Sequence, residues 1–194
     1  FTMVGTAKVD PFAKKITNKI KVRALWLLTT FIGGLFSAYI LNQFQSSITD
    51  FSTVLFFIPF VLGISGNVGL QGSTVIVRGL ATGDIQKDNI LTVVRSELIV
   101  GIANGIIFGF LCGFIITLIA APILQTSPLL GPAVGLGIVL AVGVAAVIGS
   151  TAPILFLKIN VDPAISSGPF VTVTNDIAGI AIYLLTTSYI YSAI

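Results

Sequence analysis

One carboxylate, that of Asp176, lies inside the last long apolar segment of the chain, residues 169–194. That segment contains no Lys, Arg or His that could neutralise it. A charged side chain at membrane depth costs about 3 kcal/mol on insertion scales, so it normally faces a charged partner, a water-filled path or a bound cation. Because the segment supplies no positive charge, we interpret Asp176 as a candidate ligand for a cation from solution.

Further oxygen-bearing groups accompany this carboxylate. Gly168 and Thr172 precede Asp176 by eight and four residues, a spacing that aligns the three along one side of a helix. An earlier apolar segment carries Asn67 and Gln71 among several glycines and a proline, which we expect to loosen the helix and free backbone carbonyls. These groups indicate either an ion pathway or a cluster of hydrogen bonds between helices.

The composition identifies an integral membrane protein. Of the 194 residues, 55% are hydrophobic and only 9% are charged, whereas about 25% of a soluble domain is charged. Five apolar segments are long enough to cross about 30 Å of hydrocarbon as helices. They are Val22–Leu41, Phe51–Val77, Ser96–Ala121, Pro132–Leu157 and Pro169–Ile194. We therefore expect an all-α fold in which residues 22–194 form a transmembrane pore domain and residues 1–21 a cytoplasmic linker or juxtamembrane helix.

The basic residues predict the orientation. All ten Lys and Arg lie before the first segment, around the second connection or after the fourth segment, and residues 42–50 and 122–131 contain none. Because cytoplasmic loops carry the excess of Lys and Arg, we expect a cytoplasmic N-terminus and an external C-terminus. The same distribution argues against a nucleic-acid partner. An odd number of spans does not divide into two equal halves, which favours a pore between subunits.

Several kinds of chemistry are excluded by residue type. The chain has no histidine and one cysteine, Cys112, so thiolate or imidazole metal sites are not expected and any bound metal must be a hard cation held by oxygen. The run from Gly63 to Gly66 matches the GxSG signature of intramembrane serine proteases. That chemistry needs a base to activate the hydroxyl, and the histidine that those enzymes use is absent. We expect no enzyme activity.

Two other features of the spans have competing interpretations. The third span holds a four-residue ladder of glycines, which predicts close helix packing within or between subunits; they are Gly101, Gly105, Gly109 and Gly113. Glu97, at the cytoplasmic end of that span, is interpreted either as an ion-pair partner of Arg78 or Arg95 or as part of a conduction path. Asp162 precedes Pro163, and we expect it to begin or cap a helical turn.

Four motifs at fixed positions point to a family. Residues 66–71 read GNVGLQ, residues 77–85 VRGLATGDI, residues 162–164 DPA, and residues 167–179 SGPFVTVTNDIAG. Together with five spans and a cytoplasmic N-terminus, this pattern resembles the transmembrane domain of the MgtE family of magnesium channels and transporters. The resemblance covers nearly the whole chain.

The resemblance implies a homodimer with one Mg²⁺ path at the subunit interface, lined by the second and fifth spans. Asp176 would anchor the ion, while Asn67 and backbone oxygens at Gly63, Gly168 and Thr172 would surround its hydration shell. It also implies a multi-pass protein of the plasma (cell inner) membrane, in contact with the lipid bilayer. Bacterial members carry cytosolic regulatory domains; about twenty residues precede the first span, so we expect those domains to be missing from this chain.

The sequence therefore predicts a magnesium channel domain, with Mg²⁺ as transported ion and ligand. Two alternatives remain open at this point. One is an ion-coupled exchanger of another divalent cation, and the other is a non-conducting membrane subunit whose polar residues only hold helices together. Oxygen ligands accept Mg²⁺, Mn²⁺, Co²⁺ and Ca²⁺, so the residues do not fix the selectivity.

Overall fold

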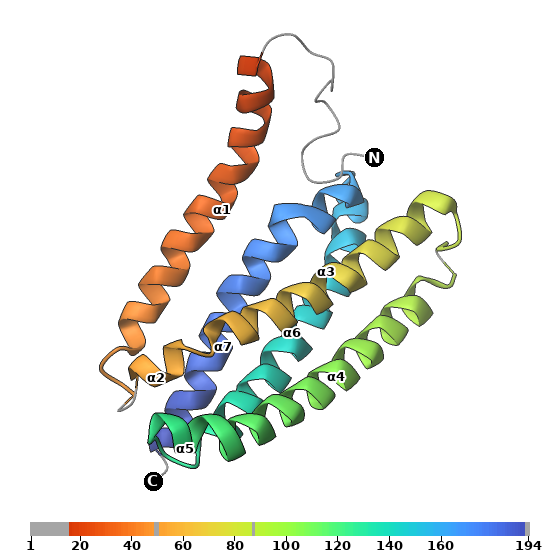
Figure 1. Ribbon diagram of the computed structural model, residues 1–194. Helices are drawn as coiled ribbons and strands as arrows, with labels where there is room; N and C mark the ends of the chain where they lie inside the picture. Colours follow the sequence, from red (N-terminus) through yellow and green to blue (C-terminus); the bar gives the residue numbers. More distant parts are fainter. Residues whose placement is uncertain (1–15, 49–50, 87, 193–194) are drawn as a thin grey trace.

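The computed structural model describes residues 16–48, 51–86 and 88–192, and this part of the chain is helical, with no strand (Figure 1). The helices are α1 (Ile16–Phe44), α2 (Phe51–Leu55), α3 (Ile58–Thr82), α4 (Ile90–Ile115), α5 (Ala121–Leu124), α6 (Leu130–Lys158) and α7 (Val171–Ser192). A π-helical turn, Ile116–Ala120, joins α4 to α5. Of the predicted linker, residues 1–15 lie outside the described residues and residues 16–21 form the first turns of α1.

Five helical stretches are long and apolar enough to cross a membrane, which confirms the predicted number of spans. They are Lys19–Phe44, Ser52–Thr82, Ile90–Leu124, Leu130–Lys158 and Gly168–Ser192. Each overlaps one of the apolar segments expected from the sequence. The fold class is therefore an all-α membrane protein with five spans per chain.

The second span is broken near its beginning and continuous afterwards. The helix is interrupted at Phe56 and Phe57, and Pro59 stands in the first turn of α3, where its missing N–H leaves no helical bond unmade. From there α3 runs unbroken to Thr82 and ends at Gly83, whose φ of 81° is a left-handed cap conformation. The expectation that the glycines of this span free its central carbonyls is therefore wrong. A helix in hydrocarbon keeps its own backbone bonds because no water replaces them.

Helix α6 is the centre of the bundle, with 61% of its most apolar stretch buried, and α3, α4 and α7 pack around it. The glycine ladder of α4 faces α6: a Cβ at Gly109 would lie 2.6 Å from the Gly135 carbonyl oxygen, and one at Gly113 3.0 Å from that of Gly131. The ladder therefore packs helices within the chain. In Figure 1, α4 and α6 run side by side, whereas α1 stands at the edge beside α7.

Two close contacts fix α3 and α7 on this centre. At the α3–α6 crossing, a Cβ at Gly149 would overlap the carbonyl oxygen of Gly69, so the two backbones touch. On α7, the fully buried Tyr183 donates its hydroxyl to the Val54 carbonyl at 2.9 Å, and its ring lies against Gly137 of α6. This hydrogen bond ties α7 to the segment just before the break in the second span.

Candidate ion-binding site

Asp176 lies where α7 runs antiparallel to α3. Along this contact Gly179 of α7 lies opposite Ser65 of α3, Asp176 opposite Gly66, and Asn175 opposite Gly69. The Asp176 Oδ1 atom is 3.9 Å from the position that a Cβ at Gly66 would take. The carboxylate is partly buried and has neither an ion pair nor a hydrogen bond within the described residues. A charge left uncompensated in a membrane helix requires water or a cation.

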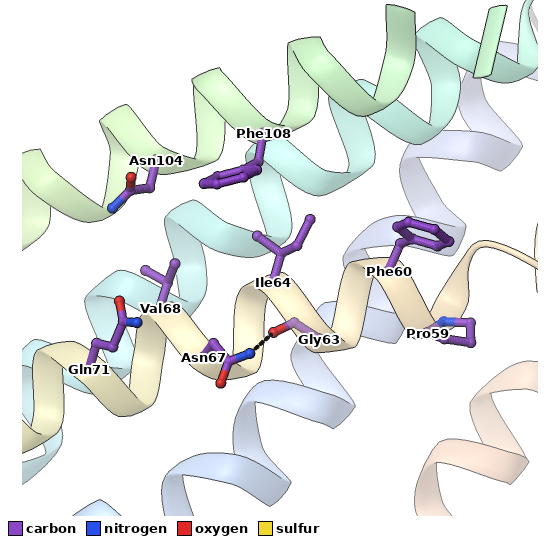
Figure 2. Close-up of a pocket in the computed structure, with 9 residues that line it drawn as sticks. All are labelled: Pro59, Phe60, Gly63, Ile64, Asn67, Val68, Gln71, Asn104 and Phe108. Atoms are coloured by element: carbon purple, nitrogen blue, oxygen red, sulfur yellow. Dashed lines mark hydrogen bonds between the residues drawn. The ribbon is translucent and has the colours of Figure 1, made fainter. Parts of the chain in front are cut away.

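Asn67 and Gly63 lie on the outward face of α3 beside this contact. Both residues are exposed, and the Asn67 Nδ2 atom donates to the Gly63 carbonyl oxygen at 2.7 Å (Figure 2). This bond uses the donor end of the amide and leaves Oδ1 as the free end. Because Asn67 follows Gly66 in the helix, the free amide oxygen belongs to the same stretch of α3 as the contact with Asp176.

Thr172 and Gly168 lie on the N-terminal side of Asp176, but only Thr172 keeps the predicted helical register. Thr172 is one turn before Asp176 in α7, about 6 Å along the axis, and it is exposed. At Gly168 the backbone leaves the helix (φ −109°, ψ −148°). Proline disfavours the helical conformation of the residue before it, and Pro169 follows Gly168 directly.

The expectation that Gly168 shares one helix face with Thr172 and Asp176 is therefore wrong. Gly168 is buried, and its carbonyl oxygen accepts the Thr172 hydroxyl at 3.5 Å. The structure places Asp176 against Gly66, which precedes Asn67 and lies about one turn of α3 from Gly63, and Thr172 lies one turn before Asp176 in α7. Gly168 is set apart behind the kink, and a carbonyl role for it stays a prediction.

The donor set of one chain suits a hydrated ion. Among the described residues no three His, Cys, Asp or Glu side chains gather at one place that could hold a metal. A single carboxylate with amide and carbonyl oxygens around it does not replace the water of a cation. Mg²⁺ dehydrates reluctantly and is usually held through one or two carboxylates with several waters retained, which this arrangement can supply.

A cavity of about 620 Å³ opens between α3 and α4 beside this site (Figure 2). The predicted site residues Gly63 and Asn67 line it, together with the amides of Gln71 and Asn104. Its lining consists of Pro59, Phe60, Gly63, Ile64, Asn67, Val68, Gln71, Asn104 and Phe108. Asn104 was not predicted as a site residue, although an amide inside an otherwise apolar span is a signal that could have marked it.

Asn175 is a second residue that sequence reasoning left without a role. It is 1% exposed, and neither amide atom has a hydrogen-bond partner in the described part of the chain. Its Nδ2 lies against Gly69, close to where the α3 and α6 backbones touch. A larger residue at position 69 would displace this amide. A glycine at position 69 is therefore needed for the packing of Asn175 as well as for the backbone contact with Gly149.

Three other acidic residues of the described chain lie away from Asp176. Asp162 Oδ1 accepts the Ala164 N–H at 2.9 Å, which confirms the predicted turn cap. Asp84 accepts the Thr82 hydroxyl at 2.6 Å in the loop after α3. Within residues 16–48, 51–86 and 88–192, Glu97 forms no ion pair, so neither Arg78 nor Arg95 neutralises it here.

A family model described as MgtE, divalent cation transporter, matches residues 58–186. The chain is 33% identical to the magnesium transporter MgtE of Thermus thermophilus over 172 residues, which is 89% of this chain and 37% of that protein. The MgtE proteins of Bacillus subtilis and Enterococcus faecalis are 33% and 32% identical and cover 88% and 83% of this chain.

The chain spans a little over a third of the length of the curated relatives it matches. The match includes every residue proposed above for the ion site and all of helices α3 to α6. A family match of this extent, over well more than half of the chain, bears out the resemblance read from the motifs. The chain belongs to the MgtE family of divalent cation transporters, which confirms that it is a multi-pass membrane protein and not an enzyme.

Proposed function

We propose that this chain forms the transmembrane pore of a homodimeric magnesium channel of the plasma membrane and that it holds hydrated Mg²⁺ beside Asp176. One observation carries the proposal: the unpaired Asp176 carboxylate lies against Gly66, next to the exposed Asn67 and Gly63. The names of the curated relatives, all magnesium transporters, support Mg²⁺ as the ion.

The polarity of the site explains how it holds an ion that keeps its water. The Asn67 amide is oriented by its bond to Gly63, so its Oδ1 faces outward as an acceptor for the hydrogens of a metal-bound water. The exposed Thr172 hydroxyl adds a further polar atom, and the Gly63 carbonyl contributes by orienting the Asn67 amide. Acceptor oxygens placed around a carboxylate favour the hydrated cation because they bind the hydrogens of its water shell.

The exposed polar stripe supports a homodimer with the path between its subunits. Gly63, Asn67 and Thr172 are exposed in the single chain at membrane depth. Lipid cannot satisfy such groups, and irregular or polar surfaces in hydrocarbon persist where they face protein or a water-filled cavity. A second copy placed against this face would enclose a path and bring two Asp176 carboxylates to one divalent ion, with the N-termini in the cytoplasm.

Flux into proteoliposomes tests this function. The full-length protein should carry Mg²⁺ down its gradient with no sodium or proton gradient present. Asp176→Asn, which keeps the shape of the side chain and removes its charge, should reduce the initial rate at least tenfold. The matched control is Asp84→Asn, a loop carboxylate that should leave the rate within twofold. Equal rates for the two variants would refute the site, and flux that needs a counter-gradient would refute the channel.

A further inference from the structure

Helix α4 carries a second carboxylate inside a membrane-spanning helix. Glu97 is partly buried, and its Oε2 atom lies 3.8 Å from the Cβ position of Gly72 on α3. Like Asp176, it has no ion pair and no hydrogen bond within the described residues. Glu97 lies at the cytoplasmic end of the span, and a partly buried carboxylate without a protein partner is satisfied there by water or a cation.

Two amides, Asn104 of α4 and Gln71 of α3, line the neighbouring cavity between these helices. Asn104 is seven residues after Glu97, two helical turns, and so shares its face of α4. Gln71 precedes Gly72 on α3. In Figure 2 the Gln71 amide extends from α3 toward α4 and the Asn104 amide from α4 toward α3. Neither amide has a hydrogen-bond partner in the described chain, and both line the α3–α4 cavity.

The size and polarity of the cavity suit a hydrated ion. Its volume of about 620 Å³ exceeds the roughly 180 Å³ that six waters occupy in the liquid. The lining is uneven: Pro59, Phe60 and Phe108 make one end apolar, while Gln71 and Asn104 make the other end polar. Glu97 is not part of the lining and lies beyond the polar end, about 10 Å from Asn104 along α4. Unpaired amides that face an open space are satisfied by water, so the polar end is expected to be wet.

We propose that the α3–α4 cavity is a second binding site for a hydrated divalent cation, which we call the second station. In this station Gln71 and Asn104 orient the ion's water shell and Glu97 supplies the charge at the cytoplasmic end. The proposal rests on the proposed function, because Gly63 and Asn67 line both the cavity and the path to Asp176. Gly72 lies six residues beyond Gly66 in α3, so the two carboxylates are separated by about 9 Å along the helix. They also flank α3 on different sides, one facing α4 and the other α7.

Cysteine accessibility tests whether the cavity is wet and holds a cation. The full-length protein with Cys112→Ala is reconstituted in liposomes, and Asn104→Cys is treated with a positively charged, water-soluble methanethiosulfonate. The matched control is Phe110→Cys, a position on the same helix that is 77% exposed on the apolar surface. We expect Asn104→Cys to react at least tenfold faster than the control, and millimolar Mg²⁺ to slow it at least fivefold. Equal rates would show a dry or covered cavity and overturn the proposal.

The role of Glu97 is tested in the same assay. Glu97→Gln keeps the side-chain shape and should abolish protection by Mg²⁺, whereas Glu97→Asp keeps the charge and should retain it. Protection that persists in Glu97→Gln would overturn the station. Retained reaction of Asn104→Cys in both variants shows that each is folded.

The Asp176→Asn variant separates this inference from the function on which it rests. The station predicts that Mg²⁺ still protects Asn104→Cys in Asp176→Asn, with the half-protecting concentration changed less than threefold. Loss of protection as complete as in Glu97→Gln would show that no separate station exists. If Asp176→Asn left the flux unchanged while protection still required Glu97, the Asp176 site would fail and the second station would stand.

Discussion

The contact between α3 and α6 at Gly69 and Gly149 should tolerate no side chain. A Cβ at Gly149 would lie 2.8 Å from both the Cα and the carbonyl carbon of Gly69 and would overlap its carbonyl oxygen, whereas ordinary contact begins near 3.4 Å. All three atoms are backbone, so no side chain can rotate away and the helices must separate by about 0.6 Å or more. Overpacking of this kind typically destabilises by about 1–3 kcal/mol.

Gly143→Ala is the matched control for Gly149→Ala, because both glycines lie in α6 and nothing lies within 4 Å of a Cβ at Gly143. The control should be neutral or stabilised by up to about 1 kcal/mol, since alanine is the better helix former. Unfolding of the purified full-length protein by denaturant titration, followed by circular dichroism, measures the difference. We expect Gly149→Ala to be less stable than Gly143→Ala by about 1–3 kcal/mol. Equal stability would refute the close backbone contact on which the α3 position depends.

Two further changes test the contacts that hold α7 and the end of α3. Tyr183→Phe removes one of the two donors to the Val54 carbonyl, which keeps the Phe57 N–H at 3.2 Å, and should cost about 0.5–1.5 kcal/mol in the same unfolding assay, whereas Tyr189→Phe, 76% exposed, should cost little. Gly83→Ala forces a side chain into a φ of 81° and should cost about 1–2 kcal/mol. Gly34→Ala is its control, because both glycines have open space around them and only Gly83 has the left-handed conformation; equal effects of the two changes would contradict the cap.

The spans and the polar residues could be predicted from the sequence because they depend on local composition. Twenty apolar residues in a row predict a crossing whatever the rest of the chain does. Asp176 was recognisable for the same reason, since an uncompensated carboxylate is unusual in any such segment. The family motifs lie in these same stretches, and the comparisons confirm them.

What the sequence could not provide depends on long-range packing. Helical spacing alone placed Gly168 in line with Thr172 and Asp176, but Pro169 moves the backbone out of the helix there. The glycines of α3 look like helix breakers in isolation, and only the positions of α6 and α7 show that Gly66 and Gly69 admit close neighbours. Asn104 gained a candidate role only once α4 was placed beside Gln71 across the cavity.

The same packing links the stability of the bundle to the ion site. Gly69, which touches the α6 backbone and the Asn175 amide, lies one turn of α3 from Gly66, which faces Asp176. Asn175 and Asp176 are neighbours in α7, so a shift of α3 away from α6 must change both contacts at once. A variant such as Gly149→Ala should therefore weaken Mg²⁺ flux although it lies on neither α3 nor α7, and Gly143→Ala should not. Normal flux in a Gly149→Ala protein of reduced stability would show that the ion site does not depend on this crossing.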